Sequence, residues 1–456
     1  MRKFAFLAGI LSVCLVAWPG PIRAAGVNQL NQPPLLDNFR NQPFSGFDLT
    51  SPNPGSAKGG LTPQQIAAAN AALHLAAQAL EKHDLDTAKA KFAEAAKDAP
   101  TAPNGFLGLA EVARQAGDQQ GVETNLKKAL DAAPQSAPAN AAWGRYLVAK
   151  KDYRGAITSF NKALLANSHD KGVLVAEGDL YASVLNDPQK AVTFYSLATK
   201  ADPKDASVHY ALGNALLAVG KNEAAVAELK VATGLEPTNV RGWTALGAAE
   251  MKGRDFPSAL TAFETAIKLQ PKYLGAQLGR ADALLMLNRN EDAIAAYQDA
   301  LKLSPHSAVI LGRVGTAQQQ AGHLDAAETA YRAAVAASPH DPAVLNDLAY
   351  FLAEQGRKLD DALRFAKEAV ERAPKASVYV DTLAWVYRAR GDLSDAEARL
   401  LPVAAGNPIL LYHLGVIQAE MNKKADALQD FDKALEIAPN YEAARLARQK
   451  LAASPG

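Results

Sequence analysis

Three histidines in similar contexts are the first residues that could do chemistry in this sequence of 456 residues. His169, His306 and His340 stand in the segments NSHD, SPHS and SPHD, and the last two are 34 residues apart. A zinc site needs three or four ligands at characteristic spacings, and no third ligand accompanies this pair. We therefore expect turn-forming polar residues at these positions and no metal site.

The motifs of nucleotide-binding and hydrolytic enzymes are missing from the sequence. It contains no G-x-x-x-x-G-K-[ST] loop, G-x-S-x-G elbow or H-E-x-x-H pair, and VGKNEA at 219–224 fits a turn between two helices. Cys14 is the only cysteine, which excludes thiol catalysis, cysteine metal sites and disulfides from the rest of the chain. The sequence predicts a protein that is not an enzyme and binds no cofactor.

The charges are balanced, with 48 lysines and arginines against 47 aspartates and glutamates. Nucleic-acid-binding proteins usually carry a basic excess on one face, so we expect no nucleic-acid partner. The 49% hydrophobic content is ordinary for a folded protein. A single compact core rarely grows beyond roughly 250–300 residues, so a chain of this length needs several domains or an elongated array.

The first 25 residues have the pattern of a secretory signal peptide. Arg2 and Lys3 precede an apolar run from Phe4 to Trp18, and small residues at 24–26 offer a cleavage site. An uncleaved membrane anchor is the alternative, but the run is shorter than the ~20 residues that a spanning helix needs. We therefore expect an exported protein, periplasmic or associated with the outer envelope, without a transmembrane segment after cleavage.

Residues 26–62 differ in composition from everything that follows. Proline, glycine, asparagine, glutamine and serine dominate, so this segment cannot bury enough apolar surface to fold by itself. We predict a flexible linker. Within it, residues 35–49 are richer in large apolar side chains, and they either dock a partner or pack back on the folded part of the chain.

Helical order is expected from Thr62, where Thr62, Pro63 and Gln65 form a capping box. A repeat of about 34 residues then follows. Its clearest marker is a proline at the end of each unit, and only one unit has serine, Ser168, at this position. The closing prolines are Pro100, Pro134, Pro203, Pro237, Pro271, Pro305, Pro339, Pro374, Pro408 and Pro439.

The unit from Gly242 to Pro271 shows what each slot does. Gly247 and Ala259 are small, so two antiparallel helices can approach closely at these positions. Trp243, Leu246 and Phe263 fill the space around the crossing, and a proline ends the second helix. One unit cannot bury its apolar face alone, so the units must stack into a solenoid.

These slots resemble the tetratricopeptide repeat family, and the segment Asn346–Val370 is similar to units common in its bacterial members. Together with the signal peptide, this indicates an exported bacterial member. The resemblance implies an all-α, right-handed solenoid of eleven helix-turn-helix repeats over residues 63–441, followed by a capping helix and tail at 442–456. The repeats are expected at 69–102, 103–136, 137–170, 171–205, 206–239, 240–273, 274–307, 308–341, 342–376, 377–407 and 408–441.

Two repeats depart from the pattern. The unit ending at Pro374 has one extra residue, with Ala366 in the aromatic slot and Phe365 displaced by one. The unit at 377–407 has Pro402 inside its second helix. Because proline breaks a helix, we expect the array to be least regular around residues 400–408.

The family resemblance implies that the first helix of each repeat lines a concave face where a partner segment binds. Helical spacing also places Thr244, Asp282 and Gln319 there. The candidate partner-binding residues are Tyr210, Asn214, Arg241, Asn346, Tyr350, Asp381, Trp385, Arg388 and Tyr412. Tyr350 and Trp385 have a second interpretation, as aromatic side chains of the core between repeats.

Two specialised binding modes of the family do not match this sequence. The clamp for chaperone carboxylates lacks its lysine before Asn214, and Ala211, Ala245 and Gly279 replace the asparagine ladder of the glycosyltransferase solenoids. The sequence predicts a non-enzymatic scaffold for an unidentified protein or peptide partner. By resemblance, the scaffold serves an envelope complex, pilus or polysaccharide-export assembly; the alternative is direct binding of an envelope polysaccharide or other polymer.

Overall fold

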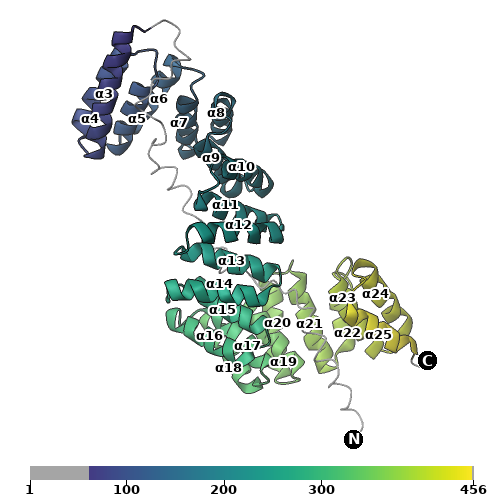
Figure 1. The fold of residues 1–456 in the computed structure, drawn as a ribbon. Helices are drawn as coiled ribbons and strands as arrows, with labels where there is room; N and C mark the ends of the chain where they lie inside the picture. The colour runs from purple at the N-terminus through teal and green to yellow at the C-terminus, as the bar shows by residue number, and fades with distance from the viewer. Residues whose placement is uncertain (1–60, 454–456) are drawn as a thin grey trace. The chain divides into compact units, whose positions relative to one another are not determined.

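The computed structural model describes residues 61–453, which form 23 α-helices and no β-strand (Figure 1). The expected all-α solenoid of helix-turn-helix repeats is confirmed. The predicted signal peptide, residues 1–25, and nearly all of the predicted linker at 26–62 lie outside the described residues. The helices divide into two compact units, each described here by itself.

The N-terminal unit covers the described residues up to Leu269. Its twelve helices are α3 (Pro63–Glu81), α4 (Leu85–Asp98), α5 (Asn104–Gln115), α6 (Gln119–Ala132), α7 (Ala137–Ala149), α8 (Tyr153–Ala166), α9 (Lys171–Ser183), α10 (Pro188–Ala201), α11 (Ala206–Ala218), α12 (Asn222–Leu235), α13 (Val240–Lys252) and α14 (Phe256–Leu269). The predicted capping box is confirmed, because Thr62 and Gln65 each hydrogen-bond the other's backbone N–H.

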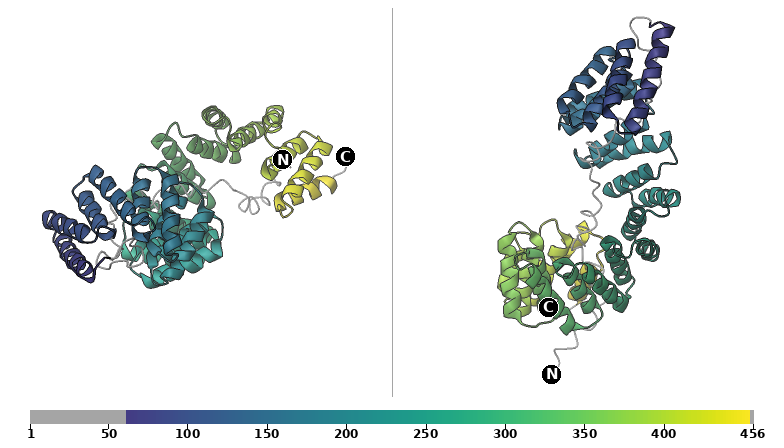
Figure 2. Two further views of the ribbon diagram at one scale, coloured as in Figure 1. Left: turned by 90° about the horizontal axis from the view of Figure 1, so that it is seen from above. Right: turned by 90° about the vertical axis from the view of Figure 1, so that its left-hand side faces the viewer.

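The C-terminal unit begins at Gln270. Its helices are α15 (Leu274–Met286), α16 (Asn290–Leu303), α17 (Ala308–Gln320), α18 (Leu324–Ala337), α19 (Pro342–Glu354), α20 (Leu359–Arg372), α21 (Ser377–Arg390), α22 (Leu393–Leu400), α23 (Pro408–Glu420), α24 (Lys424–Ile437) and α25 (Glu442–Ala453). Within each unit, consecutive helices pack side by side, as the further views in Figure 2 show.

Small residues allow the two helices of a repeat to approach closely, as the sequence predicts. A Cβ atom added to Gly247 would lie 2.8 Å from the ring of Phe263, and one added to Gly315 would lie 2.8 Å from Tyr331. Ala259 is fully buried at the same crossing. The small residue on the first helix of a repeat and the large residue on its second helix therefore contact each other directly.

A recurring hydrogen bond, which the sequence pattern did not reveal, connects the start of one repeat to the end of the preceding one. In four repeats, the slot of Trp243 holds a side-chain donor to the carbonyl oxygen of the closing proline six residues earlier. Trp243 Nε1 lies 2.8 Å from the Pro237 oxygen, and the other three pairs are Asn140–Pro134, His209–Pro203 and Gln277–Pro271. Tryptophan, asparagine, histidine and glutamine are thus interchangeable here because each carries an N–H group.

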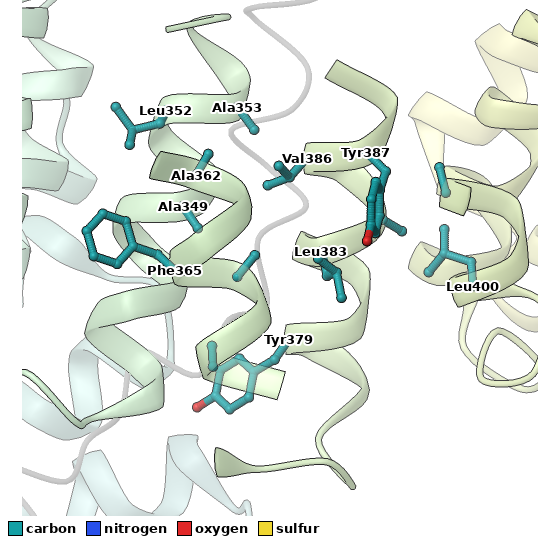
Figure 3. Packing of buried hydrophobic residues seen from close by; sticks show 14 of the residues in the cluster. Ala349, Leu352, Ala353, Ala362, Phe365, Tyr379, Leu383, Val386, Tyr387 and Leu400 are labelled. Carbon is teal, nitrogen blue, oxygen red and sulfur yellow. The ribbon is translucent and has the colours of Figure 1, made fainter. Parts of the chain in front are cut away.

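The two irregular repeats behave differently. The extra residue of the first lies in the turn between α19 and α20, where Gly356 and Lys358 both have a positive φ. Phe365 is nevertheless buried and belongs to the same hydrophobic core as Leu383 and Leu400, drawn in Figure 3.

The second irregularity is the predicted break near residue 400, which is confirmed. Helix α22 has 8 residues, whereas α20 and α24 have 14 each. One detail of the prediction is wrong: Pro408 does not close a repeat. It is the first residue of α23, where proline is favoured, and Asn407 caps the helix.

Candidate functional site

Helices α19, α21 and α23 are the first helices of three successive repeats in the C-terminal unit, and α21 contacts the other two. We call the side chains that these helices present to each other and to solvent the first-helix face. It carries six of the nine predicted binding residues: Asn346 and Tyr350 on α19, Asp381, Trp385 and Arg388 on α21, and Tyr412 on α23.

Trp385 is the centre of this face and reaches both neighbouring helices. Its indole N–H donates a hydrogen bond to Glu354 at the end of α19. The centroid of its ring lies 4.4 Å from that of His413 on α23, and the Arg388 guanidinium lies 4.3 Å from the indole centroid. One half-buried tryptophan therefore links three repeats.

An ion pair and a contact between a histidine and a carboxylate flank the tryptophan. Arg388 Nε donates to Glu420 over 3.0 Å, and a second guanidinium nitrogen donates to the same carboxylate. His413 Nδ1 lies 2.8 Å from Asp381 Oδ1, and both side chains are 14% exposed. The predicted residues Asp381, Trp385 and Arg388 thus belong to one network that runs between α21 and α23.

The remaining predicted residues of this face differ in their surroundings. Asn346 is 3% exposed, and its Oδ1 atom is buried without a hydrogen-bond partner. Tyr350 is half-buried. Tyr412 packs against Tyr441, with ring centroids 5.4 Å apart, and against Phe431. Tyr412 is therefore also part of the contact with the last helices of the chain.

The other three predicted residues lie in the N-terminal unit and are not brought together with this network. Tyr210 is half-buried on α11 and packs with the core around Leu246. Asn214 is half-buried on the same helix, and Arg241 is exposed at the start of α13. Thr244, expected on the same face, is 1% exposed, so it belongs to the interior.

Two further residues expected on the binding face accept hydrogen bonds from side chains of their own or the next repeat. Asp282 accepts hydrogen bonds from Tyr297 and Arg313, and Gln319 accepts one from Tyr331 over 3.1 Å. The sequence does contain a signal for the first pair. A tyrosine in the large slot follows an aspartate by 15 residues, and Asp179 pairs with Tyr195 in a similar way over 2.6 Å.

Sequence reasoning missed three residues of the network: Glu354, His413 and Glu420. Glu354 and Glu420 each occupy the last position of a first helix, α19 and α23. A carboxylate is unfavourable there because the helix dipole already places partial negative charge at the C-terminus. A glutamate at the C-terminus of two first helices is therefore unusual and could have been noticed in the sequence. In the structure, each of these carboxylates accepts a hydrogen bond from a side chain of α21.

The N-terminal unit contains three acids whose pKa is raised. Burial raises the pKa of Glu177 and of Glu250 to about 7 and that of Asp179 to about 6. Catalysis would need such a group in a cavity open to substrate. The cavity found between α3, α4 and α5 is lined mainly by apolar residues, among them Leu61, Ile66 and Leu73, and holds none of these acids.

Within residues 61–453, no three histidine, cysteine, aspartate or glutamate side chains are grouped so that they could hold a metal ion. His340 lies 2.7 Å from an Arg372 nitrogen, which indicates a surface contact. In the same part of the chain, no helix has the length and apolar character needed to cross a membrane.

The tetratricopeptide repeat family model matches residues 141–206, 181–240, 244–308 and 315–377, and a second model of the same repeat matches residues 408–441. The chain therefore belongs to the tetratricopeptide repeat family. Proteins of this family are generally non-enzymatic scaffolds that bind other proteins, and this is the class of protein that the fold defines.

Several solved structures are similar to this chain. Yeast Tom70 shares 15% identity over 84% of this chain and 95% of its own, with a TM-score of 0.49. A tetratricopeptide repeat protein from Parabacteroides merdae shares 20% over 54% of this chain and 98% of its own, with a TM-score of 0.47. The Cut9–Hcn1 assembly of the APC/C shares 14% over 86% and 98%, with a TM-score of 0.44. No curated protein sequence matches the chain.

Proposed function

We propose that this protein is an exported, non-enzymatic scaffold of the cell envelope that binds a segment of a partner protein on the first-helix face of the C-terminal unit. The observation that carries the proposal is the network around Trp385. It places an indole ring, a guanidinium and several carboxylates on one surface across three repeats. Tryptophan, tyrosine and arginine are the residues most enriched at the centres of protein interfaces.

Direct binding of a polysaccharide has less support. A sugar usually stacks on an exposed aromatic face, whereas the indole of Trp385 already has the Arg388 guanidinium at 4.3 Å and the His413 ring at 4.4 Å. A sugar ring would have to displace one of these groups, and Arg388 is held in place by Glu420. A protein segment can instead bind beside the indole and use the surrounding charges.

Export rests on residues 1–25 alone. The expected result is a mature chain whose N-terminus lies near residue 26, found in the envelope fraction. Intact-mass measurement and N-terminal sequencing of the protein from its native host check this. A chain that retains Met1 and stays in the cytosol would remove the envelope from the proposal and leave the scaffold.

The partner is tested by in-cell crosslinking and pull-down from the envelope fraction. The full chain is compared with a Tyr350→Ala, Trp385→Ala double variant and with a control variant, Tyr153→Ala, Phe194→Ala, whose half-buried rings lie on second helices of the N-terminal unit. Circular dichroism must show equal helix content for all three.

A discrete protein that the wild type and the control capture, and that the Tyr350→Ala, Trp385→Ala variant loses, supports the proposal. A protein captured equally by the wild type and both variants places the binding site elsewhere. If no protein is captured, tryptophan fluorescence of the full chain is measured with envelope oligosaccharides added. A shift in that emission would turn the conclusion toward polymer binding.

A further inference from the structure

We propose that the first-helix face of α19, α21 and α23 binds an extended protein segment in which lysine or arginine side chains alternate with apolar ones. This inference rests on the proposed function and specifies the chemistry of its partner. It follows from three observations: the charge of the face, an unpaired acceptor within it, and a row of apolar side chains along its edge.

The face is acidic where it is most exposed. Helices α19, α21 and α23 carry four carboxylates and two arginines. One arginine, Arg390, is held by Asp360 and Asp392, outside these three helices. Glu354 is exposed and the Glu420 side chain is 40% exposed, whereas that of Arg388 is 28% exposed. A cation therefore meets carboxylates before it meets the guanidinium.

The helix ends reinforce this charge. Glu354 and Glu420 stand at the C-termini of α19 and α23, where the helix dipoles add partial negative charge. Helix C-termini favour lysine or arginine, and these two helices have no basic residue in their last turn. Arg388 already places a positive charge at the end of α23, whereas Glu354 at the end of α19 receives the neutral indole N–H of Trp385. A cationic side chain of a partner would therefore add positive charge at the end of α19.

The second observation is the unpaired acceptor of Asn346, on the same helix as Glu354. Its Oδ1 atom is buried and has no donor, which is costly in a folded protein. The equivalent position on α17 is Gly312, where an added Cβ would meet nothing within 4 Å. Gly312 therefore leaves open space at the equivalent position one repeat away, along the line of first helices. An N–H group of the partner would supply the donor that Asn346 lacks.

The third observation concerns the N-terminal ends of α21 and α23, and of α17, which is the first helix of the repeat before α19. Val309 on α17 is 52% exposed and Val378 on α21 is 40% exposed, and Ile409 on α23 is half-buried. These residues occupy the second position of their helices, so they form an apolar row at the end opposite the carboxylates. A segment with alternating apolar and basic side chains can contact both ends.

The probe is a fluorescein-labelled decapeptide of lysine–leucine pairs separated by serine, titrated with the purified chain and followed by fluorescence anisotropy. Two counterparts carry glutamate in place of lysine, or serine in place of leucine. The lysine–leucine peptide is expected to bind at least about tenfold more tightly than either counterpart at low salt, and its affinity should fall as salt is added.

Charge-neutral variants locate the contact. The Glu354→Gln, Glu420→Gln double variant keeps acceptors for Trp385 and Arg388 but loses two charges, so the lysine–leucine peptide should bind about tenfold more weakly. The matched control is Glu371→Gln, Glu436→Gln, which removes two exposed charges from second helices and should leave binding unchanged. Asn346→Leu should weaken binding without changing its dependence on salt.

Three results would overturn the inference: no binding of the lysine–leucine peptide, equal binding of the glutamate peptide, or equal losses in the two double variants. The experiments distinguish failure of this inference from failure of the proposed scaffold function. A captured partner that depends on Tyr350 and Trp385 but whose crosslinked segment lacks basic residues refutes the charge assignment alone. Peptide binding as described, without any captured partner, leaves the charge assignment intact and counts against the protein scaffold.

Discussion

Replacing Glu177 by leucine is expected to stabilise the N-terminal unit, by an amount that grows as the pH rises from 4.5 to 7. Glu177 lies on α9 with no exposed surface, and neither of its carboxylate oxygens has a hydrogen-bond partner. Burial raises its pKa from the ordinary 4.5 to about 7. Other repeats place a leucine in the same slot, such as Leu212 and Leu246.

The magnitude follows from the two pKa values. Below pH 4.5 the carboxyl group is protonated in the folded and the unfolded chain, so it adds no pH dependence. Between pH 4.5 and 7 the unfolded chain releases its proton while the folded chain keeps it, so the free energy of unfolding falls as the pH rises. Each pKa unit corresponds to about 1.4 kcal/mol, which gives a penalty of about 3 kcal/mol above pH 7.

Leucine removes that penalty and buries additional apolar surface, which adds about 1–2 kcal/mol at every pH. Amide hydrogen exchange in α9 and α10, corrected for the intrinsic effect of pH, is the appropriate assay, because repeat arrays open locally. At pH 8 the opening free energy of Glu177→Leu should exceed that of the wild type by about 4–5 kcal/mol. At pH 4.5 only the apolar part should remain.

Two variants separate the contributions. Glu177→Gln is neutral at both pH values but keeps a buried polar group, so it should reproduce the pH-dependent gain alone. Glu264→Gln, an exposed residue on α14 of the same unit, should change little. Asp179 and Glu250 also have raised pKa values, so each variant is compared with the wild type at the same pH. A gain from Glu177→Leu that is equal at pH 4.5 and pH 8 would refute the buried charge.

Three other predictions concern the repeats. Gly247→Ala should cost about 2 kcal/mol because its Cβ would lie 2.8 Å from Phe263, whereas Gly234→Ala on α12, where a Cβ meets nothing within 4 Å, should gain about 0.5–1 kcal/mol in thermal unfolding. Residues 400–408 should exchange amide hydrogens faster than the equivalent segments of α20 and α24, and equal rates would contradict the weakness inferred from the short α22. Trp243→Phe should cost about 1 kcal/mol, because the Pro237 carbonyl loses its donor; an unchanged melting temperature would show that water replaces it.

The repeat pattern was predictable because each position in the repeat has a steric requirement, and the residue type found there shows what that requirement is. Gly247 and Phe263 meet at one crossing, so the small and the large residue recur together at a fixed spacing. Pro402 shortens its helix whatever surrounds it. Local rules of this kind recur from repeat to repeat, and the period of the sequence makes both the rules and their exceptions visible.

The hydrogen bonds were less predictable because they depend on which of several polar side chains reaches which acceptor. Asp282 has the helical spacing of a binding residue, yet Tyr297 and Arg313 occupy its carboxylate. Glu177 has the spacing of a core leucine and is buried despite its charge. Spacing assigns a side chain to a side of the helix, but only the neighbouring helices determine whether its polar atoms are free.

Binding and stability are coupled on the first-helix face, because the same side chains serve both. Trp385 joins α21 to α19 through Glu354, and Arg388 joins α21 to α23 through Glu420. A cationic side chain that takes Glu420 from Arg388 would break one of these links, whereas a donor that reaches Asn346 would satisfy an acceptor that is otherwise unpaired. A ligand stabilises the state that it prefers, so hydrogen exchange in α23 with and without the lysine–leucine peptide distinguishes the two contributions. Slower exchange means that binding preserves the network, and faster exchange means that the partner competes with it.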